Sequence, residues 1–271
     1  MNRQKHKRVI ISGGGTGGHV FPAISIANAL RRIDAETEIL FVGAIGRMEM
    51  EKVPEAGYRI IGLPVEGLQR RFTLKNISVL IRLIKSLKMA KNIILEFRPD
   101  VAVGVGGYAS GPVLRQAGRM GIPTIIQEQN SYAGLTNKLL AKKASAICVS
   151  YDGMEKYFPA GKIIKTGNPV RENLDNLESL KGEALSFFNL NGERPVILVL
   201  GGSLGAGSIN SSLSDAIGKI GNSSCFWLWQ TGKYYYEHIN DQVSQSGFDN
   251  IAVYGFIKRM DYAYAAADII V

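Results

Sequence analysis

A short apolar strand that runs into a glycine-rich loop and then into a helix occurs twice in this chain. The first copy comprises residues 7–12, the loop 13–18 and a helix that begins near Pro22. The second comprises residues 195–200 and the loop 201–207, followed by apolar residues at helical spacing. This order of elements is typical of Rossmann-like α/β units, in which helices cover both faces of a parallel sheet. The sequence therefore predicts two α/β domains.

The length of 271 residues also suits two domains, because a domain has roughly 150 residues on average. We assign residues 1–167 to an N-terminal domain, the polar segment 168–192 to a linker, and residues 193–271 to a C-terminal domain. The second domain would end inside its fourth strand, so we expect it to be incomplete and the chain to be truncated. Further strands are expected at residues 38–43, 101–105, 124–127, 146–150, 163–166, 226–230, 251–254 and 268–271.

Hydrophobic residues make up 46% and charged residues 20% of the chain, a balance that excludes disordered and collagen-like proteins. Cys148 and Cys225 are far apart and form no CxxC pair, so neither a zinc site nor a redox pair is expected. No segment has the apolar run of a signal peptide or the ~20 apolar residues of a membrane helix. These features predict a protein of the reducing cytoplasm.

The net charge of +9 is concentrated in residues 1–8 and 66–98. The second segment has eight Lys or Arg residues against two Glu, which favours a local anionic partner and not nucleic acid. Residues 73–97 have helical periodicity and suit two roles: a core helix with a solvated face, or a face that rests on an anionic membrane. Their apolar and basic positions are Ile77, Leu80, Ile81, Ile84, Leu87, Arg82, Lys85, Lys88 and Lys91.

The first glycine loop matches G-x-G-x-x-G, but two common functions of such loops do not fit. A dinucleotide-binding loop requires an acidic residue at the end of the second strand, and residues 41–44 contain none, which argues against a nicotinamide-dependent oxidoreductase. A Walker A loop requires a lysine where this chain has His19. Two interpretations of the loop remain: a structural turn, or a loop where a ligand approaches the backbone at a helix N-terminus. His19 would then be either a structural histidine, or a base or hydrogen-bond partner for the ligand.

Other polar residues follow expected strands, at the carboxyl ends where open α/β sheets bind ligands. In the second half, the loop 201–207 offers the Ser203 hydroxyl and backbone N–H groups as a pyrophosphate cradle. No D-x-D sequence for metal–nucleotide binding occurs. In the first half, the candidate ligand contacts are Tyr108, Ser110, Glu128, Asn130 and Arg171, the last of which suits a phosphate clamp or an ion pair.

Six segments occur in order along nearly the whole chain: GGGTGGHVFPAISIANAL, VGVGGYASGP, IIQEQNSYAGLTNKLLAKKA, GNPVR, LGGSLGA and YGFIKRMDYAYAAADIIV. Together they resemble the UDP-N-acetylglucosamine transferases of peptidoglycan synthesis, in glycosyltransferase family 28. The resemblance implies an α/β fold with two Rossmann-like domains of the GT-B type facing across a cleft. It also implies inverting transfer of GlcNAc from UDP-GlcNAc to the MurNAc C4 hydroxyl of undecaprenyl-pyrophosphoryl-MurNAc-pentapeptide (lipid I), giving lipid II without a cofactor.

The resemblance also implies roles for residues at matching positions. His19 and Glu128 would be the candidate general bases, and Thr16, Gly17 and Gly18 would line the cleft near the sugar nucleotide. The remaining contacts would be Tyr108 and Asn130 to the acceptor and transferred sugar, Arg171 and Ser203 to the donor, and the backbone of Ile257 to the uracil. Residues 66–98 would dock the protein on anionic phospholipid at the cytoplasmic face of the plasma membrane.

Two departures from the family pattern concern the donor. The family usually has glutamine where this chain has Leu204, so one polar contact near the phosphates is absent. The family also continues beyond residue 271 with an acidic residue that grips the ribose, a glutamine that contacts GlcNAc, and a closing helix. We therefore expect an incomplete donor site. An inactive fragment, or a non-catalytic nucleotide-sugar binder at the membrane surface, is the alternative function.

Overall fold

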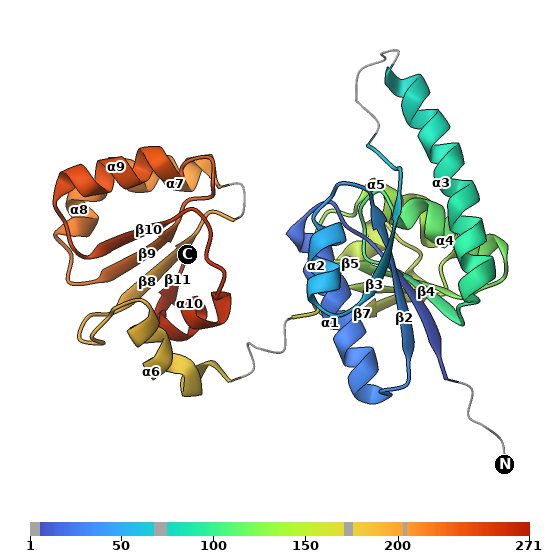
Figure 1. Cartoon of the computed structure of the whole chain (residues 1–271), viewed down its shortest axis with the longest axis horizontal. Coiled ribbons are helices and arrows are strands. Elements are labelled where there is room, and N and C mark those ends of the chain that lie inside the picture. Colours follow the sequence, from blue (N-terminus) through green and yellow to red (C-terminus); the bar gives the residue numbers. More distant parts are fainter. Residues whose placement is uncertain (1–5, 68–74, 171–175, 203–204) are drawn as a thin grey trace. The chain divides into compact units, whose positions relative to one another are not determined.

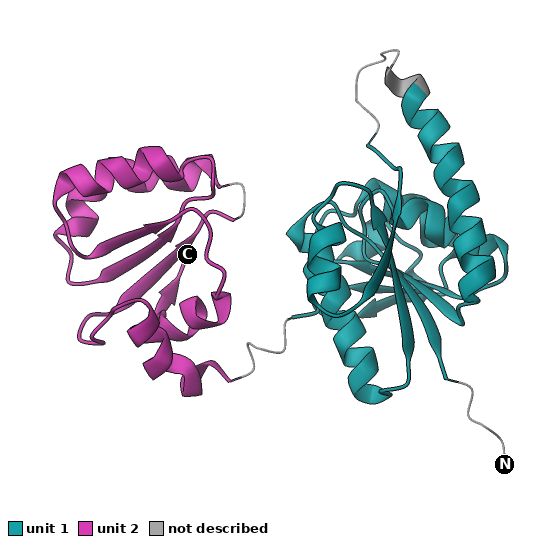
Figure 2. Cartoon of the chain, viewed as in Figure 1, with its two compact units in different colours: residues 1–171 teal, residues 172–271 magenta. Residues whose placement is uncertain are grey.

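The computed structural model describes residues 6–67, 75–170, 176–202 and 205–271. The chain divides into two compact units, Met1–Arg171 and Glu172–Val271, coloured separately in Figure 2. Each unit has its own parallel sheet with helices on both faces. The structure thus confirms the predicted α/β fold with two Rossmann-like units.

The sheet of the first unit contains seven parallel strands in the order β3-β2-β1-β4-β5-β6-β7. The order reverses between β1 and β4, and open α/β sheets bind ligands at the carboxyl edge beside such a switch point. β3 was not expected, because it is a short edge strand with only Leu63 fully buried. The strands are β1 (Arg8–Ser12), β2 (Glu38–Ala44), β3 (Arg59–Leu63), β4 (Val101–Gly104), β5 (Thr124–Glu128), β6 (Ala146–Val149) and β7 (Ile163–Lys165).

Among the described residues, five α-helices cover the two faces of this sheet. α1 (Gly17–Ile33) and α2 (Glu49–Glu55) pack on one face, around Ile11, Phe41 and Val53. α3 (Lys75–Phe97), α4 (Ser110–Arg119) and α5 (Leu135–Leu140) belong to the other face (Figure 1). Both faces are buried, which explains why the central strands are apolar along their whole length. Single 3-10 turns follow at Ala141–Lys143, Met154–Lys156 and Ala160–Lys162.

The first half of α3 extends beyond the sheet that its second half covers (Figure 1). Ala90, Ile93 and Ile94 are buried in the core, whereas Ile81 and Ile84 are each 61% exposed. The prediction of a core helix is therefore correct only for the second half. A core helix does not account for Leu80, Ile81 and Ile84, which are each more than half exposed, although Val79 of the same half is buried.

The sheet of the second unit has the order β10-β9-β8-β11, which repeats the first four positions of the larger sheet. α6 (Leu177–Phe187) and α10 (Met260–Ala266) pack on one face. α7 (Gly207–Asp215), α8 (Ile217–Gly221) and α9 (Tyr236–Ser246) pack on the other (Figure 1). The strands are β8 (Val196–Leu200), β9 (Phe226–Gln230), β10 (Ile251–Tyr254) and β11 (Ile269–Ile270).

The segment 168–192, expected as a linker, contains helix α6. Its Ala184 is fully buried, Leu180 packs against the same core, and the neighbouring Phe188 is buried beside Tyr254. The helix therefore belongs to the second unit, whose boundary lies at residues 171–172. Its apolar residues Leu177, Leu180, Ala184 and Phe188 recur at the three- and four-residue spacing of an amphipathic helix, a signal that the assignment to a linker did not use.

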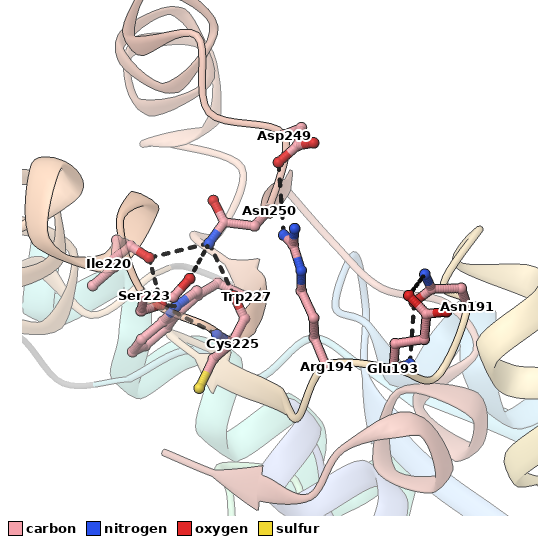
Figure 3. A network of polar contacts seen from close by, with 9 residues as sticks. All are labelled: Asn191, Glu193, Arg194, Ile220, Ser223, Cys225, Trp227, Asp249 and Asn250. Atoms are coloured by element: carbon pink, nitrogen blue, oxygen red, sulfur yellow. Dashed lines mark hydrogen bonds and ion pairs between the residues drawn. The ribbon is translucent and has the colours of Figure 1, made fainter.

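A polar network lies at the amino ends of the strands of the second unit (Figure 3). Asn250 donates hydrogen bonds to the carbonyls of Ile220 and Cys225, and the indole of Trp227 donates to Ser223 Oγ. These bonds satisfy the backbone of the α8–β9 turn. Because ligands bind at the carboxyl ends in such sheets, we interpret this network as structural.

Candidate functional site

Two glycine loops meet at the switch point between β1 and β4. A Cβ atom on Gly107 would lie 2.4 Å from the carbonyl oxygen of Gly14, and Gly107 has a φ of +83°. A Cβ on Gly13 would overlap the side chain of Val105. Only glycine permits this approach, so the two loops form one continuous backbone surface at the switch point.

His19 lies in the first turn of α1, beside both loops. Its Nδ1 atom is 3.0 Å from the carbonyl oxygen of Gly14, and because a carbonyl only accepts, Nδ1 carries the proton. Nε2 then has a free lone pair, and it faces Gly106, where a Cβ would lie 2.8 Å away. His19 is half-buried, and its unprotonated Nε2 is chemically able to accept a proton.

Thr16, Gly17 and Gly18 form the end of the first loop and the start of α1. Thr16 occupies the N-cap position in an extended conformation, and it and Gly18 are exposed. The hydroxyl of Thr16 lies 3.4 Å from His19 Nδ1. The first N–H groups of a helix have no partner within the helix, so this segment offers donors to an anionic ligand.

Glu128, at the end of β5, is 1% exposed, and its carboxylate accepts four hydrogen bonds. Oε1 accepts from the backbone N–H and the side chain of Asn130, at 3.1 and 3.2 Å. Oε2 accepts from Gly134 N and Asn137 Nδ2, both at 2.9 Å. These four donors occupy the carboxylate's acceptor sites and attach the loop after β5 to α5.

Tyr108 and Asn130 are exposed on the loops after β4 and β5. Tyr108 is 55% exposed, and its hydroxyl lies close to Gly67. The two loops are joined by Gln129, whose Nε2 donates to the carbonyl of Val105 at 2.9 Å. The first unit therefore brings Thr16, His19, Tyr108 and Asn130 to the carboxyl edge of three adjacent strands.

The loop after β8 is the corresponding feature of the second unit. A Cβ on Gly205, which has a φ of +85°, would lie 2.3 Å from the carbonyl oxygen of Thr231. The same carbonyl accepts a 2.8 Å hydrogen bond from Asn210, which in turn accepts one from Trp229. These contacts fix the loop against the end of β9. Ser203 and Arg171, both expected to hold the donor, lie outside the described residues.

Ile257 follows β10, and its side chain is buried in the core of the second unit. Only its backbone can therefore meet a ligand, as the resemblance implies.

In the segment that follows Ile257, Arg259 donates three hydrogen bonds to the Asp261 carboxylate, and the shortest is 2.6 Å. The Arg259 guanidinium holds the pKa of Asp261 below its usual range, so this carboxylate stays ionised beside the loop.

Glu49 is a residue of this site that the sequence patterns did not indicate. It is 1% exposed, and its carboxylate accepts 2.8 Å hydrogen bonds from Gly15 N and Ala44 N. It is the first acidic residue after β2, five positions beyond Ala44. A search for an acidic residue at the end of β2 misses Glu49, because Glu49 lies in α2 and its side chain extends back to the glycine loop.

The described residues contain no group of three or more His, Cys, Asp or Glu side chains arranged to hold a metal ion. Within the described ranges, no helix is both long and apolar enough to cross a membrane.

The chain matches two family models and many curated sequences. Residues 9–149 match the glycosyltransferase family 28 N-terminal domain, and residues 196–271 match its C-terminal domain. A UDP-N-acetylglucosamine–N-acetylmuramyl-(pentapeptide) pyrophosphoryl-undecaprenol N-acetylglucosamine transferase of Bacteroides thetaiotaomicron is 59% identical over 99% of this chain and 73% of its own length. The protein of the same name from Cytophaga hutchinsonii is 50% identical over 100% of this chain and 72% of its own length.

Solved structures share the fold of this chain. The crystal structure of Acinetobacter baumannii MurG superposes with a TM-score of 0.69 at 27% identity, covering 97% of this chain and 72% of that one. A UDP-GlcNAc 2-epimerase from Neisseria meningitidis shares the fold, with a TM-score of 0.68 at 15% identity over 97% of this chain and 76% of that one. The chain therefore belongs to glycosyltransferase family 28, among the UDP-N-acetylglucosamine transferases of peptidoglycan synthesis.

Proposed function

We propose that this protein transfers GlcNAc from UDP-GlcNAc to the MurNAc C4 hydroxyl of undecaprenyl-pyrophosphoryl-MurNAc-pentapeptide, with inversion at the anomeric carbon. Relatives that are 50–59% identical along nearly the whole chain bear the name of this activity. The structural observation that carries the proposal is the free Nε2 of His19 at the switch point of the first sheet.

In the proposed reaction, His19 is the general base. The acceptor hydroxyl attacks the anomeric carbon of GlcNAc, the bond from that carbon to the UDP oxygen breaks, and the hydroxyl proton passes to Nε2. The imidazolium that forms still donates its Nδ1–H to the carbonyl of Gly14. A positioned base of this kind typically contributes about 10²–10⁴-fold to the rate.

We assign Glu128 a positioning role and not the role of base. Its carboxylate is buried and already accepts four hydrogen bonds, so taking up a substrate proton would break contacts that hold the loop after β5. Through Asn130, the same contacts are proposed to direct a polar side chain toward the acceptor. Thr16, Gly17, Gly18 and Tyr108 are proposed to contact the substrates from the neighbouring loops.

The donor contacts are proposed for the second unit. The backbone N–H groups of the loop after β8, with Ser203, are suited to the charge that builds on UDP as it leaves. The backbone of Ile257 is proposed to recognise the uracil, because its side chain is committed to the core. Arg171 is proposed as a further donor contact.

The exposed half of α3 is proposed to dock on the inner leaflet of the plasma membrane. Leu80, Ile81 and Ile84 are exposed apolar residues, and Lys85 and Lys88 are exposed beside them. Apolar side chains gain free energy by entering the interface, and each basic residue near an anionic surface adds about 1 kcal/mol. Docking of this kind would place the protein at the cytoplasmic face, where a lipid-linked acceptor is reached laterally.

The transfer of labelled GlcNAc from UDP-GlcNAc to a soluble lipid I analogue tests the proposal. We expect a disaccharide product with inverted anomeric configuration, identified by mass spectrometry and by its coupling constant. A protein that binds UDP, measured by calorimetry, without forming product would be a nucleotide-sugar binder and would overturn the assignment. Oxidation or reduction of a nicotinamide cofactor by the same preparation would favour a different enzyme class.

A further inference from the structure

We propose that Glu49 is a positioning residue that fixes the orientation and the tautomer of His19 through the peptide group between Gly14 and Gly15. The inference rests on the proposed role of His19 as base. Glu49 makes no contact with the imidazole; it holds the N–H side of the peptide whose carbonyl side the imidazole binds.

The environment of Glu49 is unusual for a carboxylate. The side chain is 1% exposed, and among the described residues no lysine or arginine forms an ion pair with it. An unpaired buried charge is costly, so it is retained only where specific hydrogen bonds compensate it. Here the compensation comes from Gly15 N on Oε2 and Ala44 N on Oε1, each at 2.8 Å.

The chain leaves space for this carboxylate by having glycine at two positions. A Cβ on Gly14 would lie 2.1 Å from the carboxyl carbon of Glu49, and a Cβ on Gly43 would lie 2.5 Å from its Cγ. Both the glycine loop and the end of β2 therefore lie directly against the side chain. The carboxylate joins two segments that are 29 residues apart in the sequence (43 − 14).

The Gly14–Gly15 peptide group carries the effect from Glu49 to His19. No described peptide bond is cis, so the N–H and the C=O of this group point in opposite directions. Oε2 of Glu49 accepts the N–H at 2.8 Å, and Nδ1 of His19 donates to the C=O at 3.0 Å. The two side chains therefore bind the two ends of one peptide dipole.

The negative charge at the N–H end polarises this peptide and makes its carbonyl oxygen a better acceptor, because successive hydrogen bonds strengthen one another. A stronger acceptor holds the proton on Nδ1 and leaves the lone pair on Nε2, beside Gly106. It also stabilises the imidazolium that forms when Nε2 takes the substrate proton. A carboxylate that orients and stabilises a catalytic imidazole is a known arrangement, and here a peptide group stands between the two.

The tautomer is measured directly by nitrogen NMR of the histidine rings. The chain has only three histidines, His6, His19 and His238, so the spectrum is simple, and a His19→Ala sample identifies the resonances of His19. At about pH 8, where imidazole is ordinarily neutral, we expect a protonated Nδ1 and an unprotonated Nε2 for His19. An Nε2–H tautomer in the unmutated protein would overturn the proposal, whatever any variant does.

The Glu49→Gln variant removes the charge while nearly keeping the shape. We expect His19 of this variant to become a mixture of tautomers. We also expect kcat to fall at least about tenfold, which is a part of the rate enhancement that a general base supplies, while the KM for UDP-GlcNAc changes little. Glu51→Gln, on the exposed side of the same helix, is the matched control and should change neither measurement. A Glu49→Gln protein with the wild-type tautomer and kcat would contradict the proposal.

Failure of the Glu49 proposal can be distinguished from failure of the proposed function. If His19→Ala kept full transfer activity, His19 would not be the base, and the NMR measurement would still report whether Glu49 sets its tautomer.

Discussion

The imidazole of His19 lies against Gly106, at a position where any side chain would overlap Nε2. A Cβ on Gly106 would be 2.8 Å from both Nε2 and Cδ2, and the φ of Gly106 is +97°. We expect Gly106→Ala to displace the ring and to lower the transfer rate by at least about tenfold, since small misplacements of a base cost orders of magnitude. Gly118→Ala is the control, because its Cβ would meet nothing within 4 Å.

Replacing His19 tests the proposed base. His19→Ala is expected to lower kcat by about 10²–10⁴-fold while leaving UDP binding and the melting temperature nearly unchanged. The exposed His238→Ala serves as the control, measured in the same transfer assay. Full activity in His19→Ala would remove this residue from the mechanism.

Replacing Glu128 separates positioning from chemistry. Glu128→Gln presents an amide group to backbone and side-chain donors, so some of the four hydrogen bonds are lost. We expect a loss of about 2–3 kcal/mol in the free energy of unfolding, because bonds to a buried charged acceptor are strong. Thermal denaturation and transfer are measured on the same sample. Abolished transfer with unchanged stability would instead indicate that Glu128 takes the proton.

Asp268 links α6 to the start of β8 through an ion pair and a hydrogen bond. Its carboxylate accepts from Lys181 Nζ at 2.7 Å and from Val196 N at 2.8 Å, and these contacts hold its pKa below the ordinary range. Because the folded-state pKa is lowered, this stabilisation is present above the ordinary carboxyl pKa and is lost as the pH falls through the lower folded-state value.

We expect Asp268→Asn to lower the stability of the second unit by about 1 kcal/mol at neutral pH, since solvent screens the exposed ion pair and the backbone contact contributes the rest. The variant should approach the wild type at acidic pH. Denaturation followed by tryptophan fluorescence reports on this unit alone, because both tryptophans lie in β9. The exposed Asp249→Asn is the control. A pH-independent difference between Asp268→Asn and wild type would contradict this account.

The exposed half of α3 gives a prediction about membranes. The double variant Ile81→Ser and Ile84→Ser is expected to weaken binding to vesicles of anionic phospholipid by at least about tenfold, because each isoleucine transferred to the interface contributes more than about 1 kcal/mol. Sedimentation with vesicles measures the binding, and Ile33→Ser, at the exposed end of α1, is the control. If the double variant and the Ile33→Ser control bound the vesicles equally well, the docking surface would lie outside the exposed half of α3.

The sequence by itself determined the parts of this protein that depend on local pattern. The strands around the two glycine loops are apolar because both sheet faces are covered, so β1, β4, β5, β8 and β9 were predictable from short runs. The glycine spacing after β1 and β8 and the six ordered segments were sufficient to place the chain in its family. These signals need no knowledge of which segments meet in space.

Only the tertiary structure decided which side chains control the site. Glu49 is 34 positions from Gly15, and no periodicity links a carboxylate on α2 to the N–H of a distant loop. The four donors around Glu128 come from a loop and a helix whose approach depends on the packing of α5. The burial of α6 and the exposure of the first half of α3 were likewise decided by the extent of each sheet, because an amphipathic pattern does not say where its partner surface ends.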